Sequence, residues 1–182
     1  MNFQYPTELE DHIRLPNGEE LRIRPLRRGD DRSIRQLYGN LSADTRYLRF
    51  FSPLPQLPDS VLQLITGVDY CGRMGLIAEM KAPDGVQVVA LGSFAAVNDN
   101  TAEVALVVAD RWQHRGIGTA LAARLLRAAE ARGFDRFVAH IIHGNAVIRR
   151  LLDRATVVVS IKTQSAVSEV LFVRRRCTAS GG

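Results

Sequence analysis

Two glycines and several hydrogen-bond donors lie together where an apolar run of the sequence meets an alanine-rich run. The stretch reads Gln113, His114, Arg115, Gly116, Ile117, Gly118 and Thr119. If a helix begins at the glycines, the N–H groups of its first turn have no acceptor within the helix. Those groups and the positive end of the helix dipole suit a phosphate oxygen. The spacing therefore predicts an anion site, with a tight turn and incidental glycines as the alternative.

The glycines explain how a phosphate could come close. Gly116 and Gly118 have no Cβ, so the backbone can approach a pyrophosphate directly. His114, Arg115 and Thr119 can add further donors. The interpretation that follows is a backbone cradle for the diphosphate of a nucleotide.

Two other nucleotide motifs do not fit this stretch. The dinucleotide-binding fingerprint needs a third glycine, but Leu121 stands there, and no acidic residue lies about 20 positions further on to bind a ribose. The Walker pattern is absent from the sequence. His140 lies within an apolar strand and His143 at its exit, so a structural role is expected for each.

The elements around the motif must position it. Residues 102–109 predict a strand before it, and residues 118–131 predict a helix after it with Leu121, Leu125, Ala128 and Ala129 on one face. Gly133 suits the end of this helix, where a positive φ is needed. Residues 137–142 predict a buried strand, which makes the unit a parallel crossover.

Further strands and helices flank this unit. Residues 41–58 open with a Ser-Ala-Asp helix start at Ser42 and predict a short helix followed by an ordered loop. Strands are expected at residues 21–26, 74–81 and 86–97 and in a final pair, and further helices at about 31–40, 59–67 and 145–155. A Pro-Asp-Gly turn joins the second and third of these strands as a hairpin. The order predicts an α/β or α+β fold with a mixed sheet.

Composition and length are those of an ordinary globular domain. The chain has 182 residues, of which 46% are hydrophobic and 24% charged. We expect a single domain over residues 21–176, an extension over 1–20 and a flexible tail over 177–182. The formal net charge of +5 comes without a basic patch interleaved with aromatics, so nucleic-acid binding is not expected.

Cysteine usage and hydropathy suggest the compartment. Cys71 and Cys177 are far apart and lack metal-ligand spacing, which predicts free thiols and no metal site. The first residues carry acids and no apolar core of a signal peptide, and no run reaches the roughly 18 apolar residues of a membrane span. The sequence therefore predicts a cytoplasmic protein without a membrane partner.

The pattern Gln113-x-x-Gly116-x-Gly118, after an apolar strand and opening a helix, resembles motif A of the GNAT N-acetyltransferase superfamily. The similarity extends in the same element order from LRIRPLRRGD to the final hairpin. LRIRPLRRGD and LSADTRYLRFFSPL resemble the catalytic domain of Pat-type protein lysine acetyltransferases. The resemblance implies a GNAT-like α/β (α+β) fold, with a mixed, mostly antiparallel twisted sheet of six to seven strands flanked by about four helices.

The resemblance also implies acetyl-CoA as co-substrate. The pyrophosphate of coenzyme A would lie on the amides of residues 114–119. Its pantetheine arm would run beside Leu106, Val107 and Val108, where the sheet of the family splays. Asn145 matches a position that often contacts the coenzyme, with a plain helix N-cap as the alternative.

The implied reaction is attack of an amine on the thioester. An alkylammonium group has a pKa of about 10.4, so a proton must be removed first. Glu103 stands where Pat-like domains carry a catalytic glutamate, and we expect it to be a buried general base, acting directly or through a water. The alternative is that Glu103 is only the polar residue at the solvent end of its strand. A backbone N–H of residues 106–108 would hold the oxyanion. Residues 145–155 contain no tyrosine, so the leaving thiolate would take its proton from water.

Three functions are compatible with these residues. The first hypothesis is a protein lysine acetyltransferase, the second an acetyltransferase of small amines, and the third a non-catalytic acetyl-CoA-binding module. The acceptor pocket is expected from residues 41–69. A cluster of Arg46, Tyr47, Arg49, Phe50 and Phe51 could shape it, or could fill the core and face solvent. A homodimer is left open.

Overall fold

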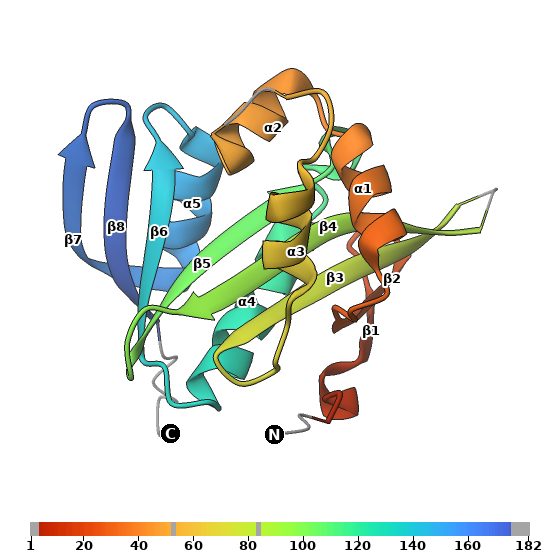
Figure 1. Ribbon diagram of the computed structural model, residues 1–182, viewed down its shortest axis with the longest axis horizontal. Helices are drawn as coiled ribbons and strands as arrows, with labels where there is room; N and C mark the ends of the chain where they lie inside the picture. Colours follow the sequence, from red (N-terminus) through yellow and green to blue (C-terminus); the bar gives the residue numbers. More distant parts are fainter. Residues whose placement is uncertain (1–3, 52–53, 83–84, 176–182) are drawn as a thin grey trace.

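One eight-stranded sheet forms the centre of the molecule, with the strand order β1-β2-β3-β4-β5-β6-β8-β7 (Figure 1). The computed structural model describes residues 4–51, 54–82 and 85–175. The strands are β1 (Asp11–Arg14), β2 (Glu20–Pro25), β3 (Arg73–Ala82), β4 (Gly85–Ala96), β5 (Thr101–Val108), β6 (Arg136–Ile142), β7 (Thr156–Gln164) and β8 (Val167–Arg174). β5 and β6 pair in parallel, as the crossover predicts, and the other neighbouring pairs are antiparallel. The predicted fold class is confirmed.

The sheet has one strand more than the six to seven expected, because β1 lies inside the segment taken as an extension. β1 pairs antiparallel with β2, and Gly18 turns the chain between them with a φ of 86°. The four residues of β1 are alternately half-buried and exposed. Such a short, largely polar strand carries no hydrophobic pattern that a sequence reading could detect. Residues 177–182, the predicted tail, lie outside the described residues.

Helices cover both faces of this sheet. They are α1 (Asp31–Gly39), α2 (Ala43–Phe50), α3 (Asp59–Thr66), α4 (Ile117–Glu130) and α5 (Ala146–Ala155). α1 and α3 lie on one face, α4 lies on the other with α5 beside it, and α2 lies against β5 and β6 (Figure 1). The five described helices compare with about four expected.

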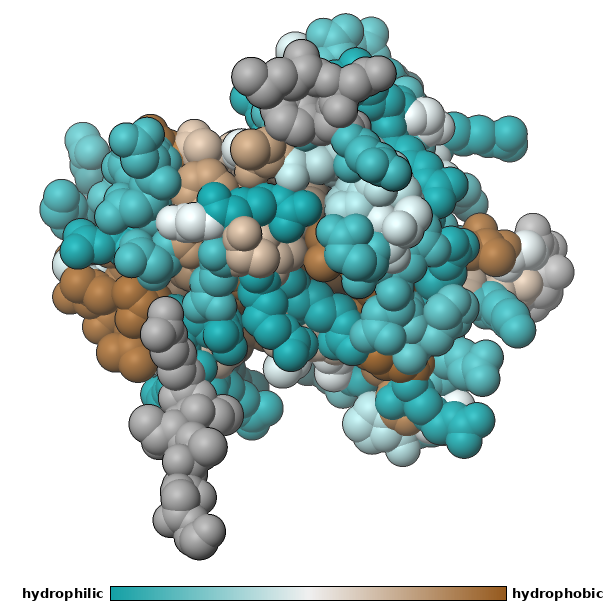
Figure 2. Space-filling view, turned by 90° about the horizontal axis from the view of Figure 1, so that it is seen from below, coloured by the Kyte–Doolittle hydropathy of each residue, from teal (hydrophilic) through white to brown (hydrophobic). Residues whose placement is uncertain are grey.

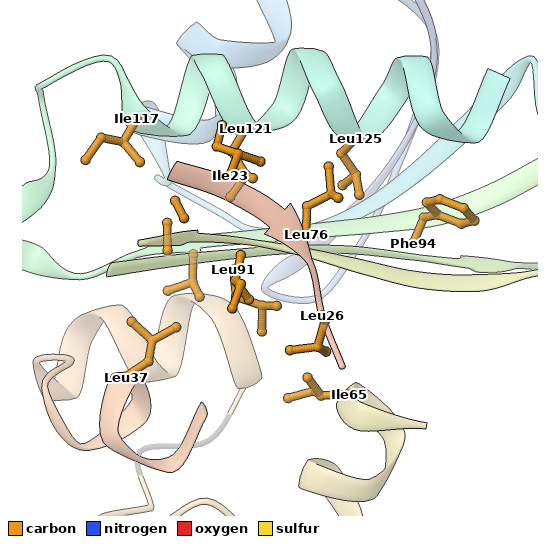
Figure 3. Packing of buried hydrophobic residues seen from close by; sticks show 14 of the residues in the cluster. Ile23, Leu26, Leu37, Ile65, Leu76, Leu91, Phe94, Ile117, Leu121 and Leu125 are labelled. Atoms are coloured by element: carbon orange, nitrogen blue, oxygen red, sulfur yellow. The ribbon is translucent and has the colours of Figure 1, made fainter. Parts of the chain in front are cut away.

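The core lies between the sheet and these two helical layers. Figure 3 shows Ile117, Leu121 and Leu125 of α4 pointing to one face of the sheet, while Leu37 and Ile65 approach from the other side. The spacing of four residues places the three α4 side chains on one helix face. Leu121 and Leu125 are at most 2% exposed, as are the other two predicted core positions of this helix, Ala128 and Ala129. Their predicted burial is confirmed.

A buried ionic cluster joins β2, β3 and the start of α1. The Arg24 guanidinium donates to both carboxylate oxygens of Asp30 at 2.8 Å, and its Nε donates to Glu79 at 2.9 Å. All three residues are at most 8% exposed. Asp30 occupies the N-cap position of α1, but its side chain accepts from the Arg27 N–H instead of capping the helix.

The charges of this cluster stabilise one another. Burial disfavours the charged form of Arg24, yet the hydrogen bond with Asp30 and the charge of Glu79 hold the pKa of Arg24 above its ordinary value. Burial also opposes ionisation of Asp30, but Arg24 and the Arg27 amide keep the pKa of Asp30 lowered. Arg24 and Asp30, both within LRIRPLRRGD, therefore have a structural role in this cluster.

The far edge of the sheet is β7, whose outward side has no strand partner among the described residues. Val157, Val159 and Ile161 are 49%, 59% and 53% exposed. Figure 2 shows a largely hydrophilic face with hydrophobic residues gathered at the side where β7 lies. The homodimer left open by the sequence stays a prediction.

The ionic cluster leads to a prediction about stability. Arg24→Met leaves two carboxylates buried without their cation, so the free energy of unfolding should fall by about 3–5 kcal/mol. Arg14→Met is the matched control, because Arg14 and Glu20 are 4.0 Å apart with side chains 75% and 62% exposed. That change should cost less than about 1 kcal/mol in the same urea titration. Equal losses in both variants would contradict the role assigned to the cluster.

Candidate active site

The parallel strands β5 and β6 part soon after they meet. Their register contains three pairs, Thr101 with Arg136, Ala102 with Phe137 and Glu103 with Val138. Beyond Glu103, residues 104–108 of β5 pair with β4 but have no strand partner toward β6. An unpaired strand side offers backbone hydrogen-bonding groups to whatever lies beside it.

A cavity of about 490 Å³ occupies the space between the parted strands. Its walls come from both faces of the sheet, with α2 on one side and α4 and α5 on the other. All six residues from Glu103 to Val108 line it, together with Gln113, His114, Gly116, Gly118, Thr119 and Asn145. Most of the predicted site residues are thus brought to one cavity.

The loop before α4 presents unused donors to this cavity. The backbone N–H groups of residues 114–119 have no hydrogen-bond acceptor among the described residues, and the next N–H, of Ala120, donates to the Gly116 carbonyl. His114 and Gly116 have φ values of 61° and 85°, which turn the chain into the helix. Such a run of free amides at the start of a 14-residue helix can bind an anion.

Glycine is needed at positions 116 and 118 for different physical reasons. Gly116 has a left-handed φ, where any Cβ is strained, although no atom lies within 4 Å of the position a Cβ would take. At Gly118, a Cβ would lie 3.5 Å from the Val108 side chain and 3.6 Å from that of Leu106. Gly116 therefore permits the turn, and Gly118 keeps space free beside the unpaired part of β5.

Two of the predicted binding residues turn their side chains away from the cavity. Arg115 forms an ion pair with Glu19 at 2.9 Å and lies over the Trp112 ring at 4.8 Å. Ile117 is 1% exposed and belongs to the core. Arg115 and Ile117 can contribute backbone amides to an anion site, but the Arg115 guanidinium is engaged elsewhere.

Asp110 links α2 to the loop before α4, residues 113–119, which we call the motif loop. Its carboxylate accepts from the Ser42 N–H at 2.8 Å, the Ser42 hydroxyl at 2.6 Å and the Thr45 hydroxyl at 2.7 Å. Gln113 adds a second link, since its Nε2 donates to the Val108 carbonyl at 3.1 Å and lies 3.5 Å from the Thr45 hydroxyl. Burial raises the pKa of Asp110, but the hydrogen bonds from Ser42 and Thr45 outweigh it and lower that pKa. The sequence signalled Ser42 as a helix start but gave no sign of its partner.

The aromatic and arginine cluster of α2 divides between cavity and core. Arg49 and Phe51 line the cavity, whereas Phe50 packs on Tyr38 with ring centroids 5.1 Å apart. Arg46 donates to the Leu41 carbonyl. Two members of the cluster therefore line the cavity and one packs beside the core, and a role in an acceptor pocket stays a prediction.

Arg49 is a half-buried cation of the cavity wall. Burial lowers the pKa of its guanidinium to about 10, although the charge of Glu103 acts in the opposite direction. Its Nε is buried and has no hydrogen-bond partner among the described residues.

Glu103 lies at the point where the strands separate. Its side chain is 50% exposed, so the expected burial is wrong: the strand end faces the open side of the sheet. One carboxylate oxygen is 3.3 Å from Nδ1 of His140, and Nε2 of that ring is 3.7 Å from the Glu169 carboxylate. His140 also lines the cavity. The sequence favoured a structural role for His140 and gave no indication of its two partners.

Asn145 starts α5, and its side chain accepts from the Ile148 N–H at 3.2 Å. This hydrogen bond is the one expected of a helix N-cap, the second of the two roles predicted for Asn145. Because Asn145 also lines the cavity, its remaining polar atoms can still meet a ligand.

The Acetyltransferase (GNAT) family model matches residues 45–155, which include β5, the motif loop and α5. The chain belongs to this family. GNAT enzymes use acetyl-CoA, so the predicted acyl donor and the assignment as an acyltransferase are confirmed.

Individual relatives are similar over most of the chain. Acetyltransferase PA5475 of Pseudomonas aeruginosa is 28% identical over 138 residues, covering 75% of this chain and 74% of that protein. Acetyltransferase Pat of Mycolicibacterium smegmatis is 31% identical over 142 residues, covering 78% of this chain. The aligned part makes up 42% of that Pat protein, so this chain corresponds to less than half of it.

Solved structures show the same fold. The GNAT domain of S. lividans PAT superposes with a TM-score of 0.83 at 26% identity, covering 93% of this chain and 99% of that one. YncA of Salmonella typhimurium, a putative acetyltransferase solved with its cofactor acetyl-CoA, has a TM-score of 0.66 at 20% identity, covering 88% and 96% of the two chains.

Three other observations concern the predicted absences. Among the described residues, His, Cys, Asp and Glu side chains nowhere gather in threes that could hold a metal ion. None of the described helices combines the length and apolar character that crossing a membrane requires. Cys71 is a free and exposed thiol, and Cys177 lies outside the described residues.

The glycine geometry predicts a contrast between two variants of this GNAT domain. Gly118→Ala should fold normally, because the added methyl makes ordinary contacts, but should weaken coenzyme A binding about tenfold by filling the wall beside β5. Gly116→Ala should lower the free energy of unfolding by about 1–2 kcal/mol, because alanine is strained at that φ. Calorimetry with coenzyme A and urea titrations measure both. Wild-type affinity in Gly118→Ala would contradict the use of this wall.

Asp110 predicts a dependence of stability on pH. Since its folded pKa is lowered, its contribution to stability is present above the unfolded pKa of about 3.9 and is lost as the pH falls through the folded pKa. Asp110→Asn should therefore reduce the free energy of unfolding by about 1 kcal/mol at pH 7, a modest figure because the site is partly screened by solvent. The difference from wild type should shrink below pH 4. A difference that is constant from pH 7 to pH 3 would show that the charge is irrelevant.

Proposed function

We propose that this acetyltransferase transfers the acetyl group of acetyl-CoA to a lysine of a protein, with Glu103 as general base. The supporting observation is the position of Glu103 at the mouth of the cavity, where the pairing of β5 and β6 ends. His114, Gly116, Gly118 and Thr119, whose backbone N–H groups have no acceptor among the described residues, line the same cavity. The same cavity therefore offers amides for the nucleotide, an unpaired strand edge for the pantetheine arm, and the Glu103 carboxylate as a base.

The donor would be held by backbone groups. The diphosphate fits the amides of residues 114–119, and Gly118 leaves room for it to continue toward β5. The pantetheine arm would use the unpaired side of Leu106, Val107 and Val108. A backbone N–H of this segment would also stabilise the oxyanion that forms on attack.

Glu103 would remove the proton that keeps the amine from reacting. A carboxylate that is half-exposed can be reached from outside by a lysine side chain on another protein. Positioning two substrates in one cavity supplies much of the rate, since effective molarities can reach about 10⁵ M or more. All four tyrosines lie within the described residues and none lines the cavity, so the thiolate would be protonated by water.

The protein acceptor is supported by the relatives and by the open site. Two of the relatives, the Mycolicibacterium protein and the S. lividans domain, carry the name Pat. Pat-type enzymes are the protein lysine acetyltransferases that the sequence resembles. The aligned part is 42% of the Mycolicibacterium protein, so only the acetyltransferase part of the comparison supports the proposal. Cytoplasmic localisation stays a prediction.

The proposal predicts the behaviour of Glu103→Gln. The amide keeps the size of the side chain but cannot accept the proton, so kcat should fall about 100-fold or more. The Kd for acetyl-CoA should stay within about twofold, because the coenzyme is held elsewhere. Labelled acetyl-CoA with a panel of proteins and small amines gives the rate, and calorimetry gives the Kd.

Glu20→Gln is the control, since Glu20 is an exposed carboxylate of β2 outside the cavity. An unchanged kcat in Glu103→Gln would remove Glu103 from the mechanism. Transfer to small amines and to no protein would overturn the acceptor. Coenzyme binding without transfer to any acceptor would favour a non-catalytic module.

A further inference from the structure

Three ionisable side chains form a row across three neighbouring strands at the cavity mouth. Glu103 lies on β5, His140 on β6 and Glu169 on β8, and His140 and Glu169 are direct cross-strand partners. Glu103 is 3.3 Å from Nδ1 of His140, and Glu169 is 3.7 Å from Nε2. Each nitrogen of the imidazole therefore faces a different carboxylate.

The row has access to solvent along its length. The side chains of Glu103, His140 and Glu169 are 50%, 37% and 45% exposed. A general base that has taken a proton from the acceptor must lose it before the next turnover. An imidazole can accept a proton at one nitrogen and release another from the second, and it does so near neutral pH.

We propose that His140 relays the proton from Glu103 to solvent, and that Glu169 is a positioning residue that fixes the tautomer of His140. This inference rests on the proposed function, in which Glu103 is the base. It assigns a task to a histidine that the fold does not need, since its partners are surface carboxylates.

The proton movements balance. When Glu103 has taken a proton from the acceptor, Nε2 of His140 carries the ring hydrogen and points to Glu169, so the Nδ1 lone pair can accept from the protonated Glu103. The acceptor ammonium loses a proton to Glu103, Glu103 passes it to Nδ1, and the Nε2 hydrogen leaves to water. One proton has then moved from the amine to solvent, and exchange with water at the exposed ring restores the first tautomer.

The other charges around the imidazole leave this path open. Arg49 of α2 interacts electrostatically with Glu103, and Lys162 of β7 is the cross-strand partner of Glu169. Arg150 and Arg154 of α5 line the same cavity. Among the described residues, none of these cations lies within 4 Å of the Glu103 or Glu169 carboxylate, whereas His140 lies within 4 Å of both.

A merely structural role makes a different prediction. Exposed ion pairs contribute at most about 1 kcal/mol, so loss of the row should leave the protein folded. A structural histidine would be replaceable by glutamine, which has hydrogen-bonding groups but no proton to exchange near neutrality. A histidine that relays protons could not be replaced by glutamine without loss of activity.

The experiment compares His140→Ala, His140→Gln and Glu169→Gln in the wild-type chain with saturating acetyl-CoA and acceptor. Both His140 variants should lower kcat about tenfold at pH 7, less than the roughly 100-fold or more expected for loss of the base itself, because water can slowly take the proton from Glu103. The KM for acetyl-CoA should stay within about twofold. Added imidazole should restore most of the rate of His140→Ala and little of that of Glu103→Gln.

Glu169→Gln should lower kcat less than the His140 variants do, and it should shift the acid limb of the pH profile of kcat. His143→Ala, an exposed histidine of the next turn, should match wild type.

The outcomes separate the relay from the proposed function. Low activity in Glu103→Gln with wild-type activity in His140→Ala would overturn the relay and leave the base in place. Recovery of activity in His140→Gln, or loss in His140→Ala that imidazole does not restore, would indicate a structural role and also overturn it. Wild-type activity in Glu103→Gln would refute the base assignment itself.

Discussion

The end of pairing between β5 and β6 after Glu103 and Val138 determines the rest of the site. The separation is fixed because each strand is held on its other side, β5 by seven register pairs with β4 and β6 by six with β8. Backbone groups left unpaired by a sheet need another partner. The cavity, the free strand side and the position of Glu103 at the opening all follow from that one interruption.

Features encoded by neighbouring residues could be predicted from the sequence. The helix α4 follows from the spacing of Leu121 and Leu125, and the amide loop follows from the positions of Gly116 and Gly118. The strand β1 could not be found, because three of its four residues are polar and so short a segment shows no period. Its place in the sheet depends on pairing with β2. Propensity and periodicity describe a segment, whereas a sheet edge is decided by its partner.

The polar contacts of the site illustrate the same limit. Asp110 and Ser42 are 68 positions apart in the chain, and Glu103 and His140 are 37 apart. Residue type alone made each of them an ordinary cap, a polar strand end or a structural histidine. The resemblance to Pat domains located Glu103 but implied nothing about its exposure, which depends on which face of the sheet the strand turns outward. Register determines those neighbours, and register is set by the whole sheet.

The contacts of Asp110 also imply that the two substrate sites are mechanically linked. The carboxylate holds Ser42 and Thr45 at the start of α2, and Gln113 of the motif loop connects Thr45 with the end of β5. The same helix carries Arg49, which lines the cavity. A coenzyme that orders the loop through its free amides would therefore also restrict α2. Acceptor binding should then be tighter after the donor is bound, because part of the ordering has already taken place.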